Sequence, residues 1–231
     1  MLSMKGVSKH FGGLKALKDV TFDIESGRIH GIIGPNGSGK TTLFNCITGL
    51  LEVTGGNIYL NDTELTGKPA HEISNMGIRR TFQQGKLVPS MTVVENVMSG
   101  IFDFKKSDIG NTFFRKPFSE SKVEKELHDR AIEMLNLLDL GASAERWASD
   151  LVWAERQFVQ IARAVVSKPD LLLLDEPASG MGPAETEEVG ALIKKIKKMG
   201  ITVVVVSHDM KMLMNVAERV TVLNFGDVIS E

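Results

Sequence analysis

Short apolar runs and helical patterns alternate along this chain. Strand-length apolar runs occupy residues 20–24, 28–33, 57–60, 170–174, 201–206 and 220–223. Apolar residues recur at helical spacing in residues 40–51 and 185–198, between such runs. Strands that alternate with helices predict an α/β fold with a mainly parallel sheet.

The middle of the chain has a different pattern. Residues 88–140 are mostly helical in pattern, and residues 120–140 are strongly amphipathic and highly charged. The apolar strand pattern returns only after this stretch. The sequence therefore predicts a parallel sheet interrupted by a helical insertion.

A glycine-rich segment after the second apolar run carries the strongest functional signal. Its sequence is Gly34-Pro35-Asn36-Gly37-Ser38-Gly39-Lys40-Thr41, which matches G-x-x-x-x-G-K-[ST] between a predicted strand and a predicted helix. Glycines let the backbone wrap a phosphate chain with its N–H groups facing inward, and the helix directs its positive end at the same anion. The segment predicts binding of ATP with Mg²⁺, in which Lys40 reaches the β- and γ-phosphates and Thr41 binds the metal.

Two carboxylates follow the apolar run at residues 170–174. Four leucines are typical of a strand buried on both faces, and Asp175 and Glu176 come directly after them. Taken alone, this pattern also fits a core strand that ends in a polar turn. Downstream of a phosphate loop it predicts catalysis, in which Asp175 holds Mg²⁺ through water and Glu176 orients and polarises the attacking water.

Two further polar side chains give weaker signals. His208 follows the apolar run that ends at residue 206, where its side chain would sense or position the terminal phosphate. Gln83 follows Arg80-Thr81-Phe82 and leads into the helical insertion, where it would contact Mg²⁺ or the water. A lone histidine after a strand is typical of polar surface, and His208 gains weight from being third in an ordered series of motifs. The segment that carries Gln83 is by itself a weak signal.

Composition limits the partners and the compartment. The chain has 231 residues and a formal net charge of -2, so its overall charge does not attract nucleic acid, and no nucleic-acid partner is expected. The single cysteine, Cys46, cannot form an internal disulfide, which favours a reducing, cytoplasmic compartment and a role in packing. No apolar run reaches bilayer length, so any membrane role would come through a partner.

The motifs in this order resemble the ATP-binding cassette (ABC) family over essentially the whole chain, and most closely the branched-chain amino-acid importer ATPases. The resemblance rests on residues 11–17, 30–42, 80–83, 91–97 and 175–181. It implies an α/β P-loop NTPase core with an antiparallel β-subdomain and an inserted helical subdomain. In a single nucleotide-binding domain, residues 1–86 and 157–231 would form the core with its β-subdomain, and residues 87–156 the helical insertion.

The resemblance also implies roles for individual residues and for partners. Phe11 would stack on the adenine, and Thr42 would add a contact to the α- and β-phosphates. His208 would contact the γ-phosphate, and Gln83 would couple the nucleotide to a membrane partner. Family members close as dimers on two ATP molecules, so the expected partners are a second ABC ATPase subunit, integral-membrane permease subunits and, indirectly, a solute-binding protein.

One segment departs from the family pattern. The family's signature, usually Leu-Ser-Gly-Gly-Gln, should stand just before residues 161–164, where this chain has Leu151-Val152-Trp153-Ala154-Glu155. The serine hydroxyl should donate to the γ-phosphate held by the opposite subunit, and valine loses this hydrogen bond of about 1.5–3 kcal/mol. Serine is also a natural helix cap, so Ser149 or Asp150 would cap one turn earlier instead. Ala154 leaves less room for backbone approach than glycine does.

Three explanations of this degenerate signature remain open. In a heterodimer, the intact phosphate loop of this chain would meet a partner's good signature. A natural variant would instead close through backbone N–H groups. An inactive scaffold is the third explanation, against which stands the presence of Lys40, Thr41, Asp175, Glu176 and His208.

The sequence thus predicts an ATP-binding and ATP-hydrolysing subunit that energises a membrane importer, peripheral on the cytoplasmic face of the cell membrane. The solute, a branched-chain amino acid or a similar small polar molecule, follows from the resemblance alone. The competing class is a soluble ABC-type ATPase that acts as a switch. Such proteins often carry two cassettes per chain or a long coiled-coil insertion, and this sequence has neither feature.

Overall fold

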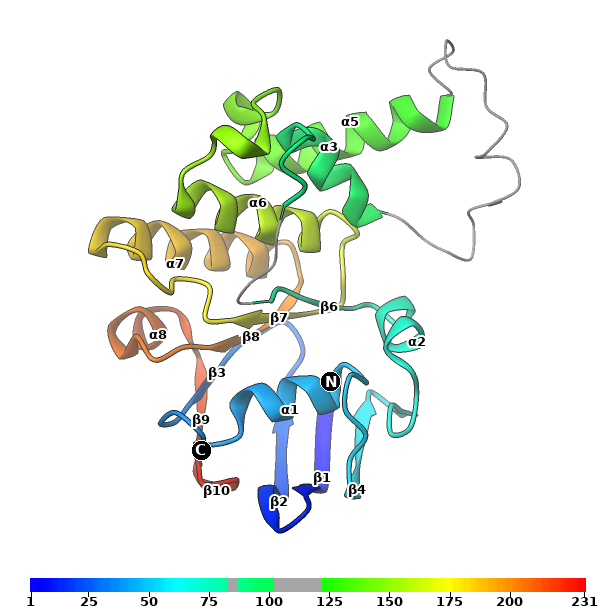
Figure 1. Ribbon diagram of the computed structural model, residues 1–231, viewed down its shortest axis with the longest axis vertical. Coiled ribbons are helices and arrows are strands. Elements are labelled where there is room, and N and C mark those ends of the chain that lie inside the picture. The colour runs from blue at the N-terminus through cyan, green and yellow to red at the C-terminus, as the bar shows by residue number, and fades with distance from the viewer. Residues whose placement is uncertain (83–86, 102–121) are drawn as a thin grey trace. The chain divides into compact units, whose positions relative to one another are not determined.

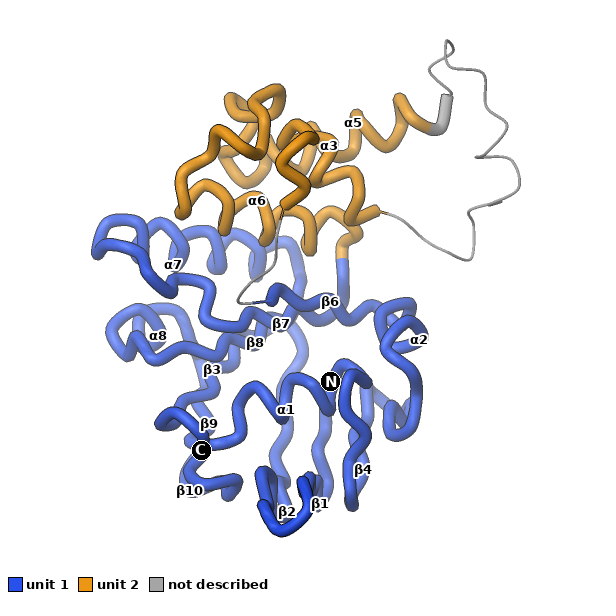
Figure 2. Tube along the Cα trace, viewed as in Figure 1, with its two compact units in different colours: residues 1–83, 169–231 blue, residues 84–168 orange. Residues whose placement is uncertain are grey.

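The computed structural model describes residues 1–82, 87–101 and 122–231 (Figure 1). The chain divides into two compact units, one of residues 1–83 and 169–231 and the other of residues 84–168 (Figure 2). Within the described ranges, no helix is both long and apolar enough to cross a bilayer.

A four-stranded antiparallel sheet opens the first unit. Its strands are β1 (Leu2–Phe11), β2 (Leu14–Ile24), β4 (Gly55–Leu60) and β5 (Thr63–Glu64), in the order β2-β1-β4-β5. Val20, Phe22 and Ile24 of β2 are buried, and the residues between them are exposed, as their alternation predicts. The pattern missed β1 because a bulge near Gly6, which has a φ of 63°, breaks its alternation.

A six-stranded sheet forms the rest of the β-structure of this unit. Its strands are β3 (Ile29–Ile33), β6 (Ile78–Arg80), β7 (Leu171–Asp175), β8 (Thr202–Val206), β9 (Arg219–Asn224) and β10 (Asp227–Ser230). The order is β10-β9-β3-β8-β7-β6, and every pair is parallel except β9 with β10. All residues of β7 and β8 are buried, which explains their continuous apolar runs. β6 and β10 have only three and four residues, and neither forms an apolar run that a pattern could reveal.

The described part of this unit also contains the helices α1 (Lys40–Ile47), α2 (Ala70–Asn75), α7 (Pro183–Lys198) and α8 (Met210–Val216). Leu43, Phe44 and Ile47 of α1 join one apolar core with buried residues of both sheets. Cys46 is buried in this core, and burial raises the pKa of its thiol to about 11, which confirms a packing role. Burial of α1 against both sheets fixes the start of the helix, and therefore the phosphate loop before it.

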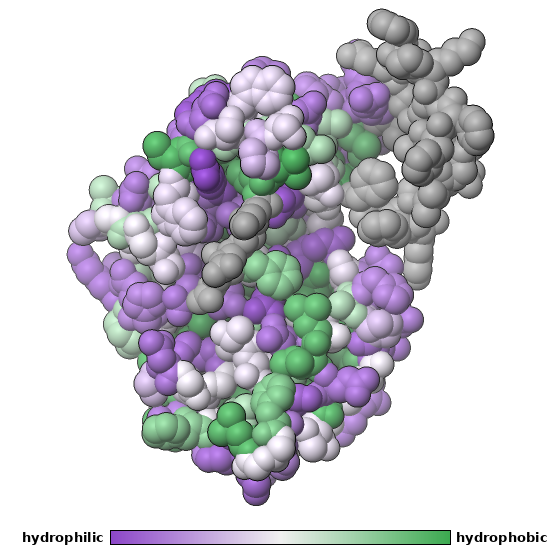
Figure 3. Space-filling model, viewed as in Figure 1, coloured by the Kyte–Doolittle hydropathy of each residue, from purple (hydrophilic) through white to green (hydrophobic). Residues whose placement is uncertain are grey.

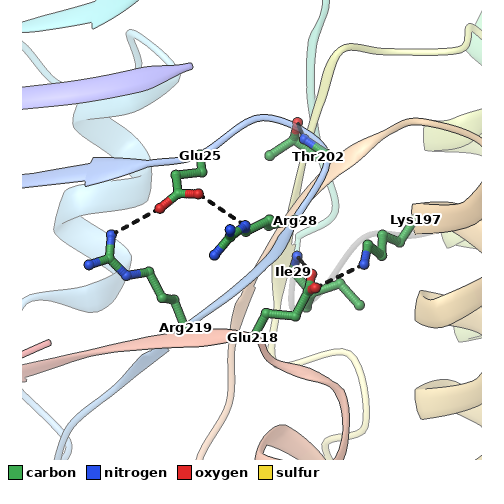
Figure 4. A network of polar contacts seen from close by, with 8 residues as sticks. Glu25, Arg28, Ile29, Lys197, Thr202, Glu218 and Arg219 are labelled. Atoms are coloured by element: carbon green, nitrogen blue, oxygen red, sulfur yellow. Dashed lines mark hydrogen bonds and ion pairs between the residues drawn. The ribbon is translucent and has the colours of Figure 1, made fainter.

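A polar network holds the ends of β3, β9 and α7 together (Figure 4). Glu218 accepts a hydrogen bond from Ile29 N at 3.1 Å and lies 2.9 Å from Lys197 Nζ. Arg219 lies 3.3 Å from Glu25. The hydrogen bond from Lys197, followed by that from Ile29 N, lowers the pKa of Glu218.

The second unit is helical, as the sequence predicts. It contains α3 (Val93–Met98), α5 (Lys122–Leu137) and α6 (Trp153–Val165), with 3₁₀ turns η1 (Ser99–Ile101), η2 (Gly141–Ser143) and η3 (Ala148–Asp150). Thr92 caps α3 by accepting from Glu95 N while the Glu95 carboxylate accepts from Thr92 N. Because α6 is one unbroken helix, this unit extends to residue 168, beyond the boundary at 156 expected from the sequence.

Candidate functional site

The phosphate loop joins β3 to α1. Gly39 is the N-cap of α1 with a φ of 105°, and a Cβ atom there would lie 2.7 Å from Ala16 O, so only glycine fits. The first N–H groups of α1, on Lys40, Thr41 and Thr42, have no acceptor within the helix, and Gly39 supplies no side-chain cap. With the positive end of the helix dipole, these groups form a binding site for an anion.

Lys40 folds back over the loop that precedes it. Its Nζ donates to Gly34 O at 2.7 Å and to Pro35 O at 2.9 Å. Burial lowers the pKa of Lys40, and the charges of Glu176 and Asp175 oppose this shift. The ammonium group is thus held by neutral carbonyls beside an anion site, where phosphate oxygens would be stronger acceptors.

Asp175 ends β7 and has one carboxylate oxygen available. Its Oδ2 accepts from Arg80 Nη2 at 2.7 Å, whereas its buried Oδ1 has no hydrogen-bond partner among the described residues. The described residues contain no cluster of three or more His, Cys, Asp or Glu that could hold a metal ion by protein ligands alone. Mg²⁺ characteristically uses one or two carboxylates together with substrate phosphates and water, so the lone Oδ1 of Asp175 and the Thr41 hydroxyl fit this ion.

Glu176 and His208 meet at the ends of β7 and β8. His208 Nδ1 lies 3.1 Å from Glu176 Oε2, and the side chain of Glu176 is 16% exposed. Glu176 has a φ of 49°, a conformation uncommon for a residue other than glycine. Its N–H donates to Val206 O at 2.8 Å, which fixes this turn to β8. The strained turn presents a carboxylate just beyond the C-terminal end of β7, where it can accept a proton.

A cleft of about 660 Å³ brings most of the predicted residues together. Its described lining comprises Phe11, Gly13, Leu14, Lys15, Ala16, Lys18, Asn36, Gly37, Ser38, Gly39, Lys40, Thr41, Thr42, Glu176 and Phe225. The volume is that of a site for a small organic molecule. Gly34 and Pro35 take part through their carbonyls on Lys40 rather than as lining. Gln83, predicted to contact Mg²⁺ or the attacking water, lies outside the described residues.

Comparison with known proteins decides the family. The sequence profile of the family described as ABC transporter matches residues 17–179. This chain belongs to the ABC transporter family. It is similar to the high-affinity branched-chain amino acid transport ATP-binding protein LivG of Escherichia coli (strain K12), with 39% identity over 227 residues, 98% of this chain and 89% of that protein.

Two solved ABC structures share the fold. One is the ADP conformation of an ATP-binding cassette of an ABC transporter, with a TM-score of 0.87 and 31% identity over 100% of this chain and 89% of that chain. The other is a dimeric post-hydrolysis state of an ATP-binding cassette bound to ADP and Pi, with a TM-score of 0.80 and 30% identity over 100% and 97%. These findings confirm the predicted family, the α/β P-loop fold and the class of protein, an ABC transporter ATPase.

Residues 151–155, which the sequence predicts to stand in the place of the ABC signature, lie at the start of α6 in the second unit. Val152 is the N-cap residue, 63% exposed, and has no side-chain acceptor for the helix. Ser149 and Asp150, predicted to cap in its place, instead belong to η3, and Ser149 Oγ donates to Asp150. That prediction is wrong because Leu151 and Val152 are extended, which separates η3 from α6.

Glu155 takes over part of the capping. Its carboxylate accepts from Val152 N at 3.0 Å and lies 2.5 Å from Arg146 Nη1. The hydrogen bond from Arg146, and then that from Val152 N, lowers the pKa of Glu155. Around it, Leu151 and Ala154 are buried, whereas Trp153 is 49% exposed. A helix therefore still begins in this segment, and the side chains of Val152 and Trp153 are exposed there. The serine hydroxyl of the usual signature is absent.

Arg80 and Phe225 are among the residues of the site that were not predicted from the sequence. Arg80 was noted only as part of the segment before Gln83, yet it pairs with Asp175. Phe225 lines the cleft from the turn between β9 and β10. No local motif marks either residue, since each reaches the site only through the pairing of strands far apart in sequence.

Proposed function

We propose that this chain binds and hydrolyses ATP to energise an importer of branched-chain amino acids or similar small polar solutes. The observation that carries the proposal is that Glu176 lines the same cleft as Lys40 and Thr41. A carboxylate beside a phosphate-binding loop supports hydrolysis as well as binding. The solute rests on the similarity to LivG, because nothing in the ATPase contacts the cargo.

The phosphate loop would hold the triphosphate. Backbone N–H groups at the start of α1 and the Lys40 ammonium would bind phosphate oxygens, and Thr42 would add a contact to the α- and β-phosphates. Phe11, 44% exposed and lining the cleft, would stack on the adenine. The loop residues Asn36, Gly37 and Ser38 also line this cleft.

Thr41 and Asp175 would hold Mg²⁺, with Gln83 as a further predicted contact. The hydroxyl of Thr41 is a direct ligand in this proposal, and Asp175 acts through water. Bound Mg²⁺ would neutralise charge on the phosphate oxygens. The loop then keeps the terminal phosphate next to Glu176.

Glu176 would orient the attacking water and accept its proton. His208 Nδ1, 3.1 Å from Glu176 Oε2, would position this carboxylate by a hydrogen bond, and His208 would also contact the γ-phosphate. Lys40 would stabilise the charge that develops on the transferred group. Replacement of Glu176 should therefore reduce turnover far more than nucleotide binding.

The partners follow from the family and from the signature segment. We propose a second ABC ATPase subunit, in a heterodimer whose other chain supplies an intact signature to the phosphate loop of this one. Val152 supports this arrangement because its side chain offers no donor to a partner's γ-phosphate. The pair would bind integral-membrane permease subunits on the cytoplasmic face of the membrane, and through them a solute-binding protein.

Two measurements test the proposal. ATPase activity of the assembled complex should fall to background in Glu176→Gln while ATP affinity stays within about three-fold of the wild-type value. Equal hydrolysis in both proteins would overturn the catalytic assignment. Co-purification from membranes should recover multi-span subunits together with this chain, and a chain that binds only soluble proteins would favour a soluble switch.

A further inference from the structure

The cleft with the phosphate loop has a second exposed aromatic side chain besides Phe11. Phe225 lines the cleft and is 70% exposed, and Leu14, which also lines it, is 66% exposed. Burial of such side chains is favourable, so their exposure along one cleft indicates a surface for an apolar or aromatic ligand group. Apolar residues also gather in Figure 3 over the region where Figure 1 places β2 and β10.

The backbone holds Phe225 in an uncommon conformation. The residue lies in the turn between β9 and β10 with a φ of 47°, in the left-handed region that bulky residues rarely adopt. A two-residue hairpin turn of type I′ requires a positive φ at both central residues, and Gly226 has a φ of 85°, so the turn and its surroundings fix this conformation. The next residue provides one such restraint, because Gly226 N donates to Ser38 O of the phosphate loop at 3.0 Å.

The same turn is fixed to the hairpin that carries Phe11. Lys18 N donates to Gly226 O at 2.9 Å, and Lys18 Nζ lies 2.9 Å from Asp227 Oδ2. Lys18 belongs to β2, which pairs with β1 up to Phe11. The turn at Phe225 is therefore connected to the phosphate loop on one side and to the β1–β2 hairpin on the other.

A lysine covers one face of the Phe11 ring. Lys9 Nζ lies over the Phe11 ring, 5.1 Å from its centroid, in a cation–π contact. A nucleobase could stack on the face of Phe11 that Lys9 does not cover. The opposite face of the nucleobase and its edge would then remain exposed unless another residue contacted them. Phe225 is the other aromatic side chain that lines the described cleft.

We propose that Phe225 is a second aromatic contact for the nucleobase, in addition to Phe11. The inference rests on the proposed binding of ATP in this cleft and adds a residue that selects for the base. Phe225 then contributes to the affinity for a nucleotide and not to the affinity for its phosphate chain.

The test compares ADP with tripolyphosphate, which lacks the base, by titration calorimetry on the full chain. Phe225→Asn removes the ring and keeps a residue that tolerates the left-handed conformation. Phe225→Tyr retains the ring. Ile229→Asn is the matched control, since Ile229 is 60% exposed on β10 and is not among the described residues that line the cleft.

Phe225→Asn should weaken ADP binding by about five-fold or more, the lower end of what loss of one base-stacking aromatic costs, and leave tripolyphosphate binding unchanged. Phe225→Tyr and Ile229→Asn should bind both ligands as the wild-type chain does. Unchanged ADP affinity in Phe225→Asn would overturn the inference. An equal loss for both ligands would also overturn it, because the turn would then act through the phosphate loop.

The wild-type titration separates this inference from the proposed function. If the wild-type chain binds ADP and Phe225→Asn binds it equally well, only the role of Phe225 fails. If the wild-type chain binds neither ADP nor tripolyphosphate, the proposed function fails, and the role of Phe225 fails with it.

Discussion

The guanidinium group of Arg80 lies 2.7 Å from Asp175 Oδ2, and both side chains are almost fully buried, with 5% and 2% exposed. Arg80 also donates to Asn45 Oδ1 of α1 at 2.6 Å. The rings of Phe44 and Phe82 lie 5.3 Å and 4.9 Å from its central carbon. Arg80 thus connects the helix after the phosphate loop to the carboxylate at the end of β7.

Removal of this arginine should destabilise the chain strongly. Arg80→Met would keep an apolar stem between the two phenyl rings but leave Asp175 as a buried, unpaired carboxylate. Loss of one partner of a buried pair costs about 3–5 kcal/mol. Denaturant unfolding in the absence of nucleotide measures this loss.

Two controls test the cause of that destabilisation. Lys197→Met breaks the half-exposed pair with Glu218 and should cost less than about 1 kcal/mol. Arg80→Met combined with Asp175→Asn should recover part of the stability, because no unpaired charge remains buried. A loss in Arg80→Met no greater than that in Lys197→Met would show that the buried pair contributes little.

Stability should also depend on pH through His30. Burial, and then the charge of Arg219, lowers the pKa of His30 from 6.5 to about 4, while Glu25 opposes the shift. Above pH 6.5 the imidazole is mostly neutral in both the folded and the unfolded chain. Between pH 6.5 and 4 only the unfolded state takes up the proton, so stability falls by about 3 kcal/mol in total as the pH decreases.

The variant His30→Gln isolates this contribution. Glutamine does not titrate and can still bond to Thr221, whose hydroxyl lies 2.8 Å from His30 Nε2. Between pH 7 and pH 4.5, urea unfolding should show a loss of stability smaller by about 2–3 kcal/mol in His30→Gln than in the wild-type chain. The same loss in both proteins would exclude His30 as the source.

One substitution at the start of α6 should raise the stability of the folded chain. Val152→Ser places a hydroxyl acceptor at the N-cap position, which should raise stability by about 0.5–1 kcal/mol. Val152→Ala is the control, since it shortens the exposed side chain without adding an acceptor. Thermal unfolding of the three proteins should show a gain for serine alone; equal melting temperatures for serine and alanine would contradict the capping argument.

The same segment should limit turnover at one ATP site. Val152→Ser combined with Ala154→Gly restores a hydroxyl donor and a glycine at two signature positions, so the steady-state ATPase rate of the assembled complex should rise. An unchanged rate would mean that neither position limits hydrolysis.

The sequence predicted what local patterns encode. Residues 34–41 were recognisable because the loop, its glycines and the lysine are contiguous, and β7 and β8 because burial on both faces requires continuous apolar residues. Arg80 and Asp175 are 95 positions apart and meet only because β6 pairs with β7. Phe225 lines the same cleft as the phosphate loop because β9, which precedes it, pairs with β3. Such contacts depend on strand order, which no local pattern specifies.

The start of α6 shows a second limit of prediction from sequence. Its position was close to expectation, but the capping residue was wrong because η3 forms a separate turn. Glu155 accepts from the N–H of Val152, but the N-cap residue Val152 has no side-chain acceptor for the first N–H groups of the helix, and Ser149 and Asp150 lie in η3. Whether a serine or aspartate caps a helix thus depends on the backbone geometry of a few residues as well as on residue type.

The central claim is that backbone amides and the Lys40 ammonium hold the phosphates of ATP. Its most direct test is calorimetric titration of MgATP into Glu176→Gln, which should bind without turnover, and into the same chain with Lys40→Ala. Binding should be saturable in the first protein and at least about a hundred-fold weaker in the second, since charge-assisted contacts to phosphate are lost. Equal affinities in two folded proteins, or no binding to the first, would contradict it.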